Sequence, residues 1–143
     1  MKKVSHFNRD SLKIIKKYTD EELDARWNDE NEFQPEAIRF IYCLVDPIEL
    51  LECLAIPGGS ARLPLHLASR LKISGVRAGV LDLELLWRNR GVAFIELKAR
   101  TATSTAQLEF LAYLELTGHR GAVCRTLREI EKFILSLGLA RRV

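Results

Sequence analysis

Two acidic residues and one lysine, Asp82, Glu96 and Lys98, have a spacing that could support chemistry on a phosphate ester. An apolar alternating run after Asp82, a turn and a second β-rich run up to Lys98 predict a β-hairpin over residues 79–98. Because side chains alternate along a strand, Glu96 and Lys98 must share one face of it. Whether Asp82 joins them depends on the length of the hairpin loop.

A two-residue loop would place Asp82 on the opposite face of the hairpin. A three-residue loop formed by residues 89–91 would place it opposite Lys98 and diagonal to Glu96. Gly91 favours this second arrangement, because three-residue hairpin loops prefer glycine at their last, left-handed position. The cross-strand spacings would then be roughly 5–8 Å.

Two carboxylates at this separation repel each other unless a cation lies between them. Mg²⁺ binds oxygen ligands and keeps several of its waters, and Mn²⁺ also suits carboxylate sites. With Lys98 facing a bound water or a phosphate oxygen, the set fits hydrolysis of a phosphodiester. The alternative is a salt bridge on an exposed hairpin face, between Lys98 and either Asp82 or Glu96.

The pattern of Asp82 followed by Glu96-Leu97-Lys98 resembles the signature of the PD-(D/E)xK nuclease superfamily. The flanking sequence is similar to one branch of it, the VRR-NUC nucleases, and the similarity covers roughly residues 32–134. The matching segments are residues 55–60, 70–75, 74–86 and 94–126. One departure is Leu81, which stands where that family has a proline before the catalytic aspartate.

The resemblance implies a metal site. Asp82 and Glu96 would be ligands of Mg²⁺ or Mn²⁺, and the backbone carbonyl of Leu97 would be a third ligand. The family also carries a glutamate near the start of the preceding helix that supports the metal. Glu32 fits this position best by spacing, and Glu36, one turn later, is its rival. A helix-start acid is also explained by the helix dipole alone.

The resemblance also implies roles for two further side chains. Lys98 would position or polarise the attacking water and stabilise developing charge. Gln107, on the helix after the metal strand, would support that water. Gln107 equally completes a capping box with Ser104, so a purely structural role for it is also open.

Charge distribution is compatible with nucleic-acid binding. The chain has 143 residues and a net charge of +3. Residues 58–81 and 97–108 contain no acidic side chain, so the segments beside the acidic pair are cationic. The candidate DNA-binding residues in them are Arg62, Arg70, Lys72, Arg77 and Arg100, although each could also be an ordinary solvated charge.

The predicted elements follow the order helix, strand, helix, strand, strand, helix, strand, helix. This order indicates an α/β fold with a central mixed β-sheet flanked by helices. The nuclease resemblance implies that it is a single restriction-endonuclease-like domain. Residues 1–30 are expected to form an accessory arm and residues 31–143 the nuclease domain. Residues 31–34 have capping-box form and should start a helix with Pro35 in its first turn.

The resulting hypothesis is a metal-dependent DNA endonuclease that prefers branched DNA and acts as a homodimer, similar to Holliday-junction resolvases. Candidate interface residues are Leu12, Ile14 and Ile15, or Leu135, Leu137 and Leu139. The alternatives are a catalytically inactive nucleic-acid-binding module and a structural protein with salt bridges only. Three scattered cysteines, the absence of a secretory signal and the short apolar runs indicate a cytoplasmic, intracellular protein outside the membrane. The nuclease resemblance implies that it is associated with DNA.

Overall fold

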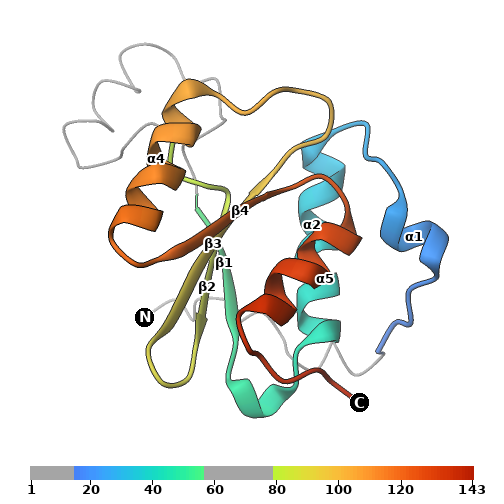
Figure 1. Ribbon diagram of the computed structural model, residues 1–143. Helices are drawn as coiled ribbons and strands as arrows, with labels where there is room; N and C mark the ends of the chain where they lie inside the picture. The colour runs from blue at the N-terminus through green and yellow to red at the C-terminus, as the bar shows by residue number, and fades with distance from the viewer. Residues whose placement is uncertain (1–14, 57–78) are drawn as a thin grey trace, which may run out of the picture.

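The computed structural model describes residues 15–56 and 79–143. Five helical segments and four strands lie in these ranges (Figure 1). In chain order they are α1 (Asp20–Asp24), α2 (Glu30–Leu44), the 3-10 turn η2 (Pro47–Glu49), β1 (Glu52–Ala55), β2 (Leu83–Trp87), β3 (Gly91–Leu97), α4 (Thr105–Leu116), β4 (Arg120–Cys124) and α5 (Leu127–Ser136). The helix expected between β1 and β2 lies outside the described residues.

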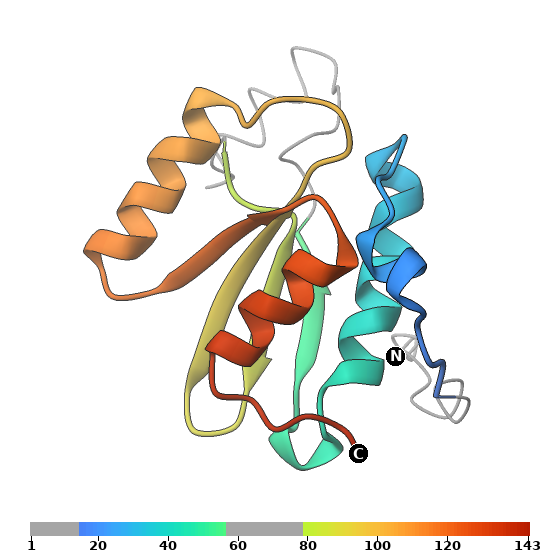
Figure 2. The same cartoon turned by 45° about the vertical axis from the view of Figure 1, so that its right-hand side comes forward.

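The four strands form one mixed sheet in the order β1-β2-β3-β4. β1, β2 and β3 are antiparallel neighbours, and β4 runs parallel to β3 after the connection through α4. Helix α4 covers one face of the sheet, while α2 and α5 cover the other (Figures 1 and 2). The α/β architecture with a mixed sheet flanked by helices, expected from the sequence, is therefore confirmed.

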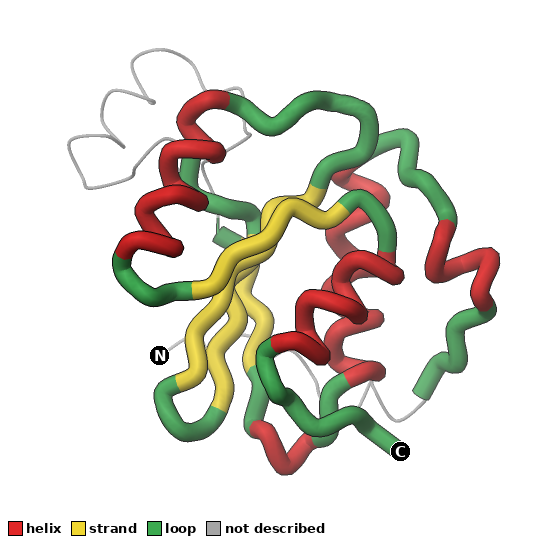
Figure 3. The backbone as a smooth tube through the Cα atoms, in the orientation of Figure 1, coloured by secondary structure: helices red, strands yellow, loops and turns green. Residues whose placement is uncertain are grey.

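Side chains of β3 point alternately to the two faces of the sheet, and each face has its own apolar cluster. Ala93, Ile95 and Leu97 are buried in the larger core, under α2 and α5. Phe94 packs on the opposite side, in a smaller cluster with residues of α4. Glu96 belongs to this second face by alternation, so β3 has an apolar side and a side that carries an acid. The tube in Figure 3 shows the strands crossing between the helix layers.

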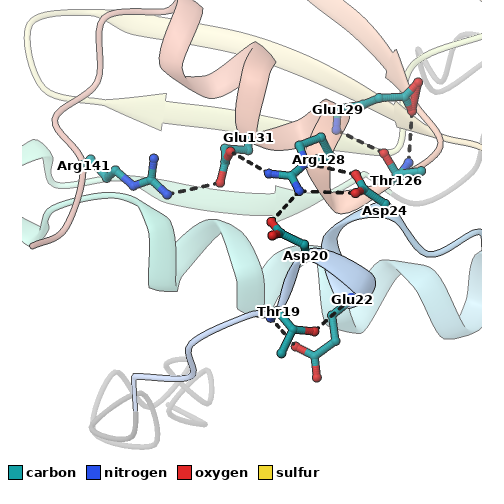
Figure 4. Close-up of polar contacts among 9 residues, drawn as sticks. All are labelled: Thr19, Asp20, Glu22, Asp24, Thr126, Arg128, Glu129, Glu131 and Arg141. Atoms are coloured by element: carbon teal, nitrogen blue, oxygen red, sulfur yellow. Dashed lines mark hydrogen bonds and ion pairs between the residues drawn. The ribbon is translucent and has the colours of Figure 1, made fainter.

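The segments before α2 and after β4 are capped and joined to each other. Helix α1 begins with a capping box between Thr19 and Glu22. Arg128 of α5 donates to Asp20 at 2.8 Å and to Asp24 at 3.0 Å, and so ties α1 to α5 (Figure 4). The described part of the predicted arm, residues 15–30, thus packs on the rest of the chain through α1, and its last residue, Glu30, is the first residue of α2.

The start of α2 differs from the prediction. Asp29 is the N-cap, and its carboxylate accepts a hydrogen bond from the Asn31 N–H at 2.8 Å. The helix therefore begins at Glu30, and the prediction of a capping box at residues 31–34 is wrong. Pro35 lies inside the helix instead of in its first turn.

The hairpin register also differs from the prediction. The loop has three residues, but they are residues 88–90, and Trp87 pairs with Gly91. Asn89 and Arg90 adopt the positive φ angles, 62° and 65°, that had been expected at Gly91. The glycine serves another purpose, because a Cβ on it would lie 2.0 Å from the Trp87 ring. Continuing this register by one pair places Asp82 level with Glu96 instead of Lys98.

Two of the three expected interface candidates near the C-terminus pack within the chain. Leu139 is buried in the larger core and Leu137 packs against it, while Leu135 is 39% exposed. Ile15 is exposed, and Leu12 and Ile14 lie outside the described residues. No helix in the two described ranges has the length and apolar content needed to cross a bilayer.

Gly79 lies three residues before Asp82, where the chain contacts α4. This close contact predicts that a larger residue at position 79 would destabilise the protein. A Cβ on Gly79 would lie 2.4 Å from the Ala106 carbonyl oxygen, a backbone atom that cannot move aside. We expect Gly79→Ala to lower the free energy of unfolding by about 1–3 kcal/mol through overpacking, beyond the cost of its positive φ. Urea unfolding monitored by circular dichroism measures this loss.

Gly118→Ala is the matched control for that variant. Gly118 has nearly the same φ, +80° against +84°, and nothing within 4 Å of an added Cβ. The difference between the two variants isolates the steric contact with α4. Equal losses in both variants would contradict the proposed contact.

Candidate active site

Asp82 and Glu96 lie together at the end of the β2–β3 ladder. Asp82 directly precedes β2, and its Oδ2 accepts a hydrogen bond from the Leu97 N–H at 2.9 Å. The Asp82 N–H in turn donates to Glu96 Oε2 at 3.1 Å. These reciprocal bonds hold two carboxylates side by side, and only 2% of Glu96 is exposed.

Leu81, the residue before Asp82, holds the backbone in place at the start of β2. Leu81 is fully buried between the sheet and α4, in one cluster with Phe110 and Leu114. This is the position at which the sequence departs from the proline of the VRR-NUC pattern. The apolar anchor under α4 restrains the chain here through packing instead of through a fixed φ.

Helix α4 brings an amide to Glu96. Gln107 Nε2 donates to Glu96 Oε1 at 2.6 Å. Its Oε1 accepts from the Ser104 N–H at 3.0 Å, and the Gln107 N–H donates to Ser104 Oγ at 3.2 Å. The capping box and the contact with the acid therefore coexist, and the cap fixes the orientation of the amide that reaches Glu96.

Lys98 supplies a positive charge to the same carboxylate. Its Nζ lies 3.7 Å from Glu96 Oε1, the oxygen that Gln107 also contacts. The ammonium is within ion-pair distance but beyond hydrogen-bonding distance, so it keeps donors for other groups. The structure thus brings together all four side chains that the sequence placed at the catalytic centre.

Burial and mutual repulsion keep the acid pair partly protonated. Burial raises the pKa of Glu96 to about 7, the negative charge of Asp82 adds to the shift, and Lys98 opposes it. Burial also raises the pKa of Asp82, against the hydrogen bond from the Leu97 N–H and the charge of Lys98. Near neutral pH the pair therefore carries less negative charge than two separate carboxylates, and a cation that binds both would displace the proton.

The acid that α2 directs toward the site is Glu30. Its Oε1 accepts from the Ala99 N–H at 3.2 Å and from the Thr101 hydroxyl at 3.0 Å. Partial burial opposes ionisation, but these hydrogen bonds and the Lys98 charge hold the pKa of Glu30 below its usual range. Its negative charge also contributes to raising the pKa of Asp82, after the larger effect of burial.

The two glutamates favoured by sequence spacing lie elsewhere. Glu32 is exposed, and no contact joins it to Asp82 or Glu96 in the described part of the chain. Glu36 accepts a hydrogen bond from the Tyr18 hydroxyl at 2.8 Å, away from the acid pair. The signal that identifies Glu30 in the sequence is Asp29, an N-cap residue placed directly before it.

The Leu97 carbonyl faces the side of β3 on which Asp82 lies. In a strand, the N–H and C=O of one residue point toward the same neighbouring strand. Because the Leu97 N–H donates to Asp82, its carbonyl is directed to that side as well. Two carboxylates and one carbonyl are oxygen donors, the type that Mg²⁺ prefers, and Mg²⁺ completes its shell with water.

The described residues offer no alternative metal site built from more side chains. In residues 15–56 and 79–143, no three His, Cys, Asp or Glu side chains form a cluster that could hold a metal ion. The buried thiols Cys53 and Cys124 lie in the larger core, away from the acid pair. The fit for a hard cation therefore depends on the two acids, a carbonyl and water.

The cationic residues expected to bind DNA are only partly described. Arg62, Arg70, Lys72 and Arg77 lie outside the described residues. Arg100 is exposed and donates to the Asn28 side chain, which joins the loop after β3 to the segment before α2. Sequence analysis assigned this loop a role only through the charge of Arg100, whereas in the structure Glu30 and Asn28 both contact it.

Comparison of the chain with protein family models, curated proteins and solved structures gave no match.

The raised pKa of Glu96 predicts how stability changes with pH. The unfolded carboxyl ionises near 4.5 and the folded one near 7, so unfolding releases a proton between these values. The free energy of unfolding of metal-free protein should fall as pH rises through this window, by about 1.4 kcal/mol per unit of pKa difference at most. Thermal unfolding in a chelating buffer measures the trend.

Added Mg²⁺ or Mn²⁺ should stabilise the protein more above this window than below it, because the cation competes with the proton. Asp82→Asn should weaken both effects by removing one of the two charges. If the free energy of unfolding of the metal-free protein instead rises with pH between about 4.5 and 7, the raised pKa of Glu96 is contradicted.

Proposed function

We propose that this chain is a metal-dependent endonuclease that hydrolyses DNA phosphodiesters. The observation that carries the proposal is the convergence of Lys98 and Gln107 on one oxygen of Glu96, beside Asp82. The order and direction of the four strands support a restriction-endonuclease-like domain of the PD-(D/E)xK type, as the motif resemblance implies. In this proposal Glu30, on α2, would have the supporting role that sequence spacing had assigned to Glu32.

Each residue has a defined role in the proposed reaction. Asp82, Glu96 and the Leu97 carbonyl would hold Mg²⁺ or Mn²⁺, with Glu30 adding negative charge behind them. When bound, the cation supplies Lewis-acid activation of water and neutralises charge on the phosphate. Lys98 orients the attacking water and stabilises the extra charge on the phosphate oxygens as the bond to the leaving sugar oxygen breaks. Gln107 keeps the Glu96 carboxylate in place.

The proposed substrate is branched DNA and the proposed assembly is a homodimer inside the cell. A four-way junction has two strands to cut and approximate two-fold symmetry, which a two-fold dimer matches with two active sites. The acid-free segment at residues 58–81 would supply the charges that attract the phosphate backbone.

A catalytically inactive nucleic-acid-binding module is the second candidate. It is favoured by one observation: both oxygens of Glu96 already have protein partners, Oε2 the Asp82 N–H and Oε1 the Gln107 amide. Such a network could serve stability alone. The two functions differ in whether a divalent cation produces cleavage.

Substitutions at the acid pair test the enzyme directly. Asp82→Asn and Lys98→Ala should each reduce cleavage by about 10²–10³ while the fold is kept, because each residue acts on charge in the transition state. Cleavage of four-way, flap, single-stranded and duplex DNA on one gel, with and without Mg²⁺ or Mn²⁺, gives both the activity and the preference.

Glu84→Gln is the matched control for this experiment. Glu84 is an acid of β2 on the same sheet face, two residues from Asp82, and is paired in register with Phe94. Its substitution should leave cleavage unchanged. Near wild-type cleavage by Asp82→Asn would refute the site assignment.

Neutralising the acid-free segment tests DNA binding separately. Arg62, Arg70, Lys72 and Arg77 changed together to alanine should weaken binding and flatten its dependence on salt. Each lost phosphate contact lowers the log–log slope by about 0.9 for duplex DNA. Fluorescence anisotropy across a salt series measures the slope.

Arg90→Ala with Lys132→Ala is the control, since both residues are exposed and lie on the hairpin loop and on α5. A quadruple variant with the wild-type slope would show that residues 58–81 do not contact DNA.

A further inference from the structure

Lys98 and Arg125 lie level with each other at the ends of two parallel strands. The register pairs Leu97 with Cys124, and the Lys98 N–H still donates to the Cys124 carbonyl at 3.1 Å. Leu97 and Cys124 are both buried in the larger core under α2 and α5. By alternation, Lys98 and Arg125 are directed to the opposite face, the one that carries Glu96.

Among the described residues, the guanidinium of Arg125 has one hydrogen-bond partner. One terminal nitrogen donates to the Thr101 carbonyl at 3.1 Å, in the loop between β3 and α4. A guanidinium carries five N–H donors, and no other group in the described ranges accepts from this one. The bond to Thr101 fixes the direction of the planar group and leaves most of its donors for a ligand.

The surroundings of these donors favour an anion. Neighbouring strands are about 4.8 Å apart, so two cationic side chains at one level repel each other unless an anion lies between them. Lys98 is drawn toward Glu96 but keeps its own donors. Arginine binds phosphate in a bidentate manner, which suits a fixed guanidinium at the rim of a site that handles phosphates.

We propose that Arg125 binds a backbone phosphate of the nucleic acid, beside the phosphate on which Lys98 and the acid pair act. This inference rests on the proposed function, because it takes the acid pair as the reacting centre. Arg125 is then a positioning residue that fixes the strand relative to Glu96 and Lys98. It adds a contact from β4 that the acid-free segments do not provide.

A structural role for Arg125 would have different consequences. If it only tethered the loop after β3, its loss would disturb Lys98 and Gln107 and lower kcat. The number of phosphate contacts would then stay the same, and so would the salt dependence of binding. Two substitutions separate the tether from the charge: Arg125→Gln keeps a donor for the Thr101 carbonyl without the charge, and Arg125→Lys keeps the charge.

The experiment is equilibrium binding of a fluorescent four-way junction and of duplex DNA in a chelating buffer, across a salt series. Arg125→Gln should bind more weakly and its log–log slope should fall by about 0.9, the value for one phosphate contact on duplex DNA. Arg125→Lys should keep the slope. In cleavage assays with metal, Arg125→Gln should raise KM more than it lowers kcat.

Arg120→Ala is the matched control. Arg120 is the first residue of β4, the strand that Arg125 directly follows; it is directed by alternation to the other face and donates to Ser136 Oγ at 2.9 Å. Its substitution should leave the slope unchanged. Circular dichroism and thermal unfolding of every variant confirm that folded protein is compared.

Two outcomes would overturn the inference: a wild-type slope in Arg125→Gln, or an equal loss in Arg120→Ala. Because binding is measured without metal, the result does not depend on catalysis. Protein that binds DNA through Arg125 but cleaves nothing with any divalent cation would refute the nuclease and leave the phosphate contact standing.

Discussion

The arrangement of this domain depends on one buried carboxylate. Glu96 is almost fully enclosed, and an ionisable group in such a place is costly unless its oxygens are satisfied. Its partners come from three places: the backbone before β2, the first turn of α4 and the end of β3. The hairpin register, the capping box of α4 and the end of β3 must all be correct for these contacts to form.

The sheet separates this polar cluster from the apolar core. On β3, side chains that point to α2 and α5 are apolar and buried, whereas the other face carries Phe94 and then Glu96 toward the open end. The apolar side supplies the burial that stabilises the sheet. The rigid strands then hold the acids at a fixed separation in spite of their repulsion, which a flexible loop could not do.

Sequence reasoning predicted the elements well and their boundaries less well. Alternation located the hairpin and the capping signal at Ser104 located the start of α4, because these signals are local in the chain. The prediction for the hairpin loop failed because glycine was assigned to a left-handed position that Arg90 takes, while Gly91 is needed for the Trp87 ring.

The acid pair survived this error for a geometric reason. The true register differs from the expected one by two residues on β3, and side chains repeat every two residues, so Asp82 and Glu96 still share a face. Glu30 was missed because one helix cap was misplaced and because its partners are distant in sequence. Spacing within a motif carries no information about such long-range contacts.

The distribution of the site along the chain has a consequence for how it assembles during folding. Asp82, Glu96, Lys98 and Gln107 are joined by contacts that span 15 residues or fewer, whereas Glu30 reaches Ala99 across 69. In an unfolded chain the longer closure costs about 1.3 kcal/mol more in entropy. Contacts of low contact order form early, so the acid pair should assemble with the hairpin and α4 before α2 docks. Asp82 and Glu96 would then come together while solvent and counter-ions can still screen their repulsion. Glu30 would dock later, when Lys98 and the counter-ions already offset the charge of the acid pair.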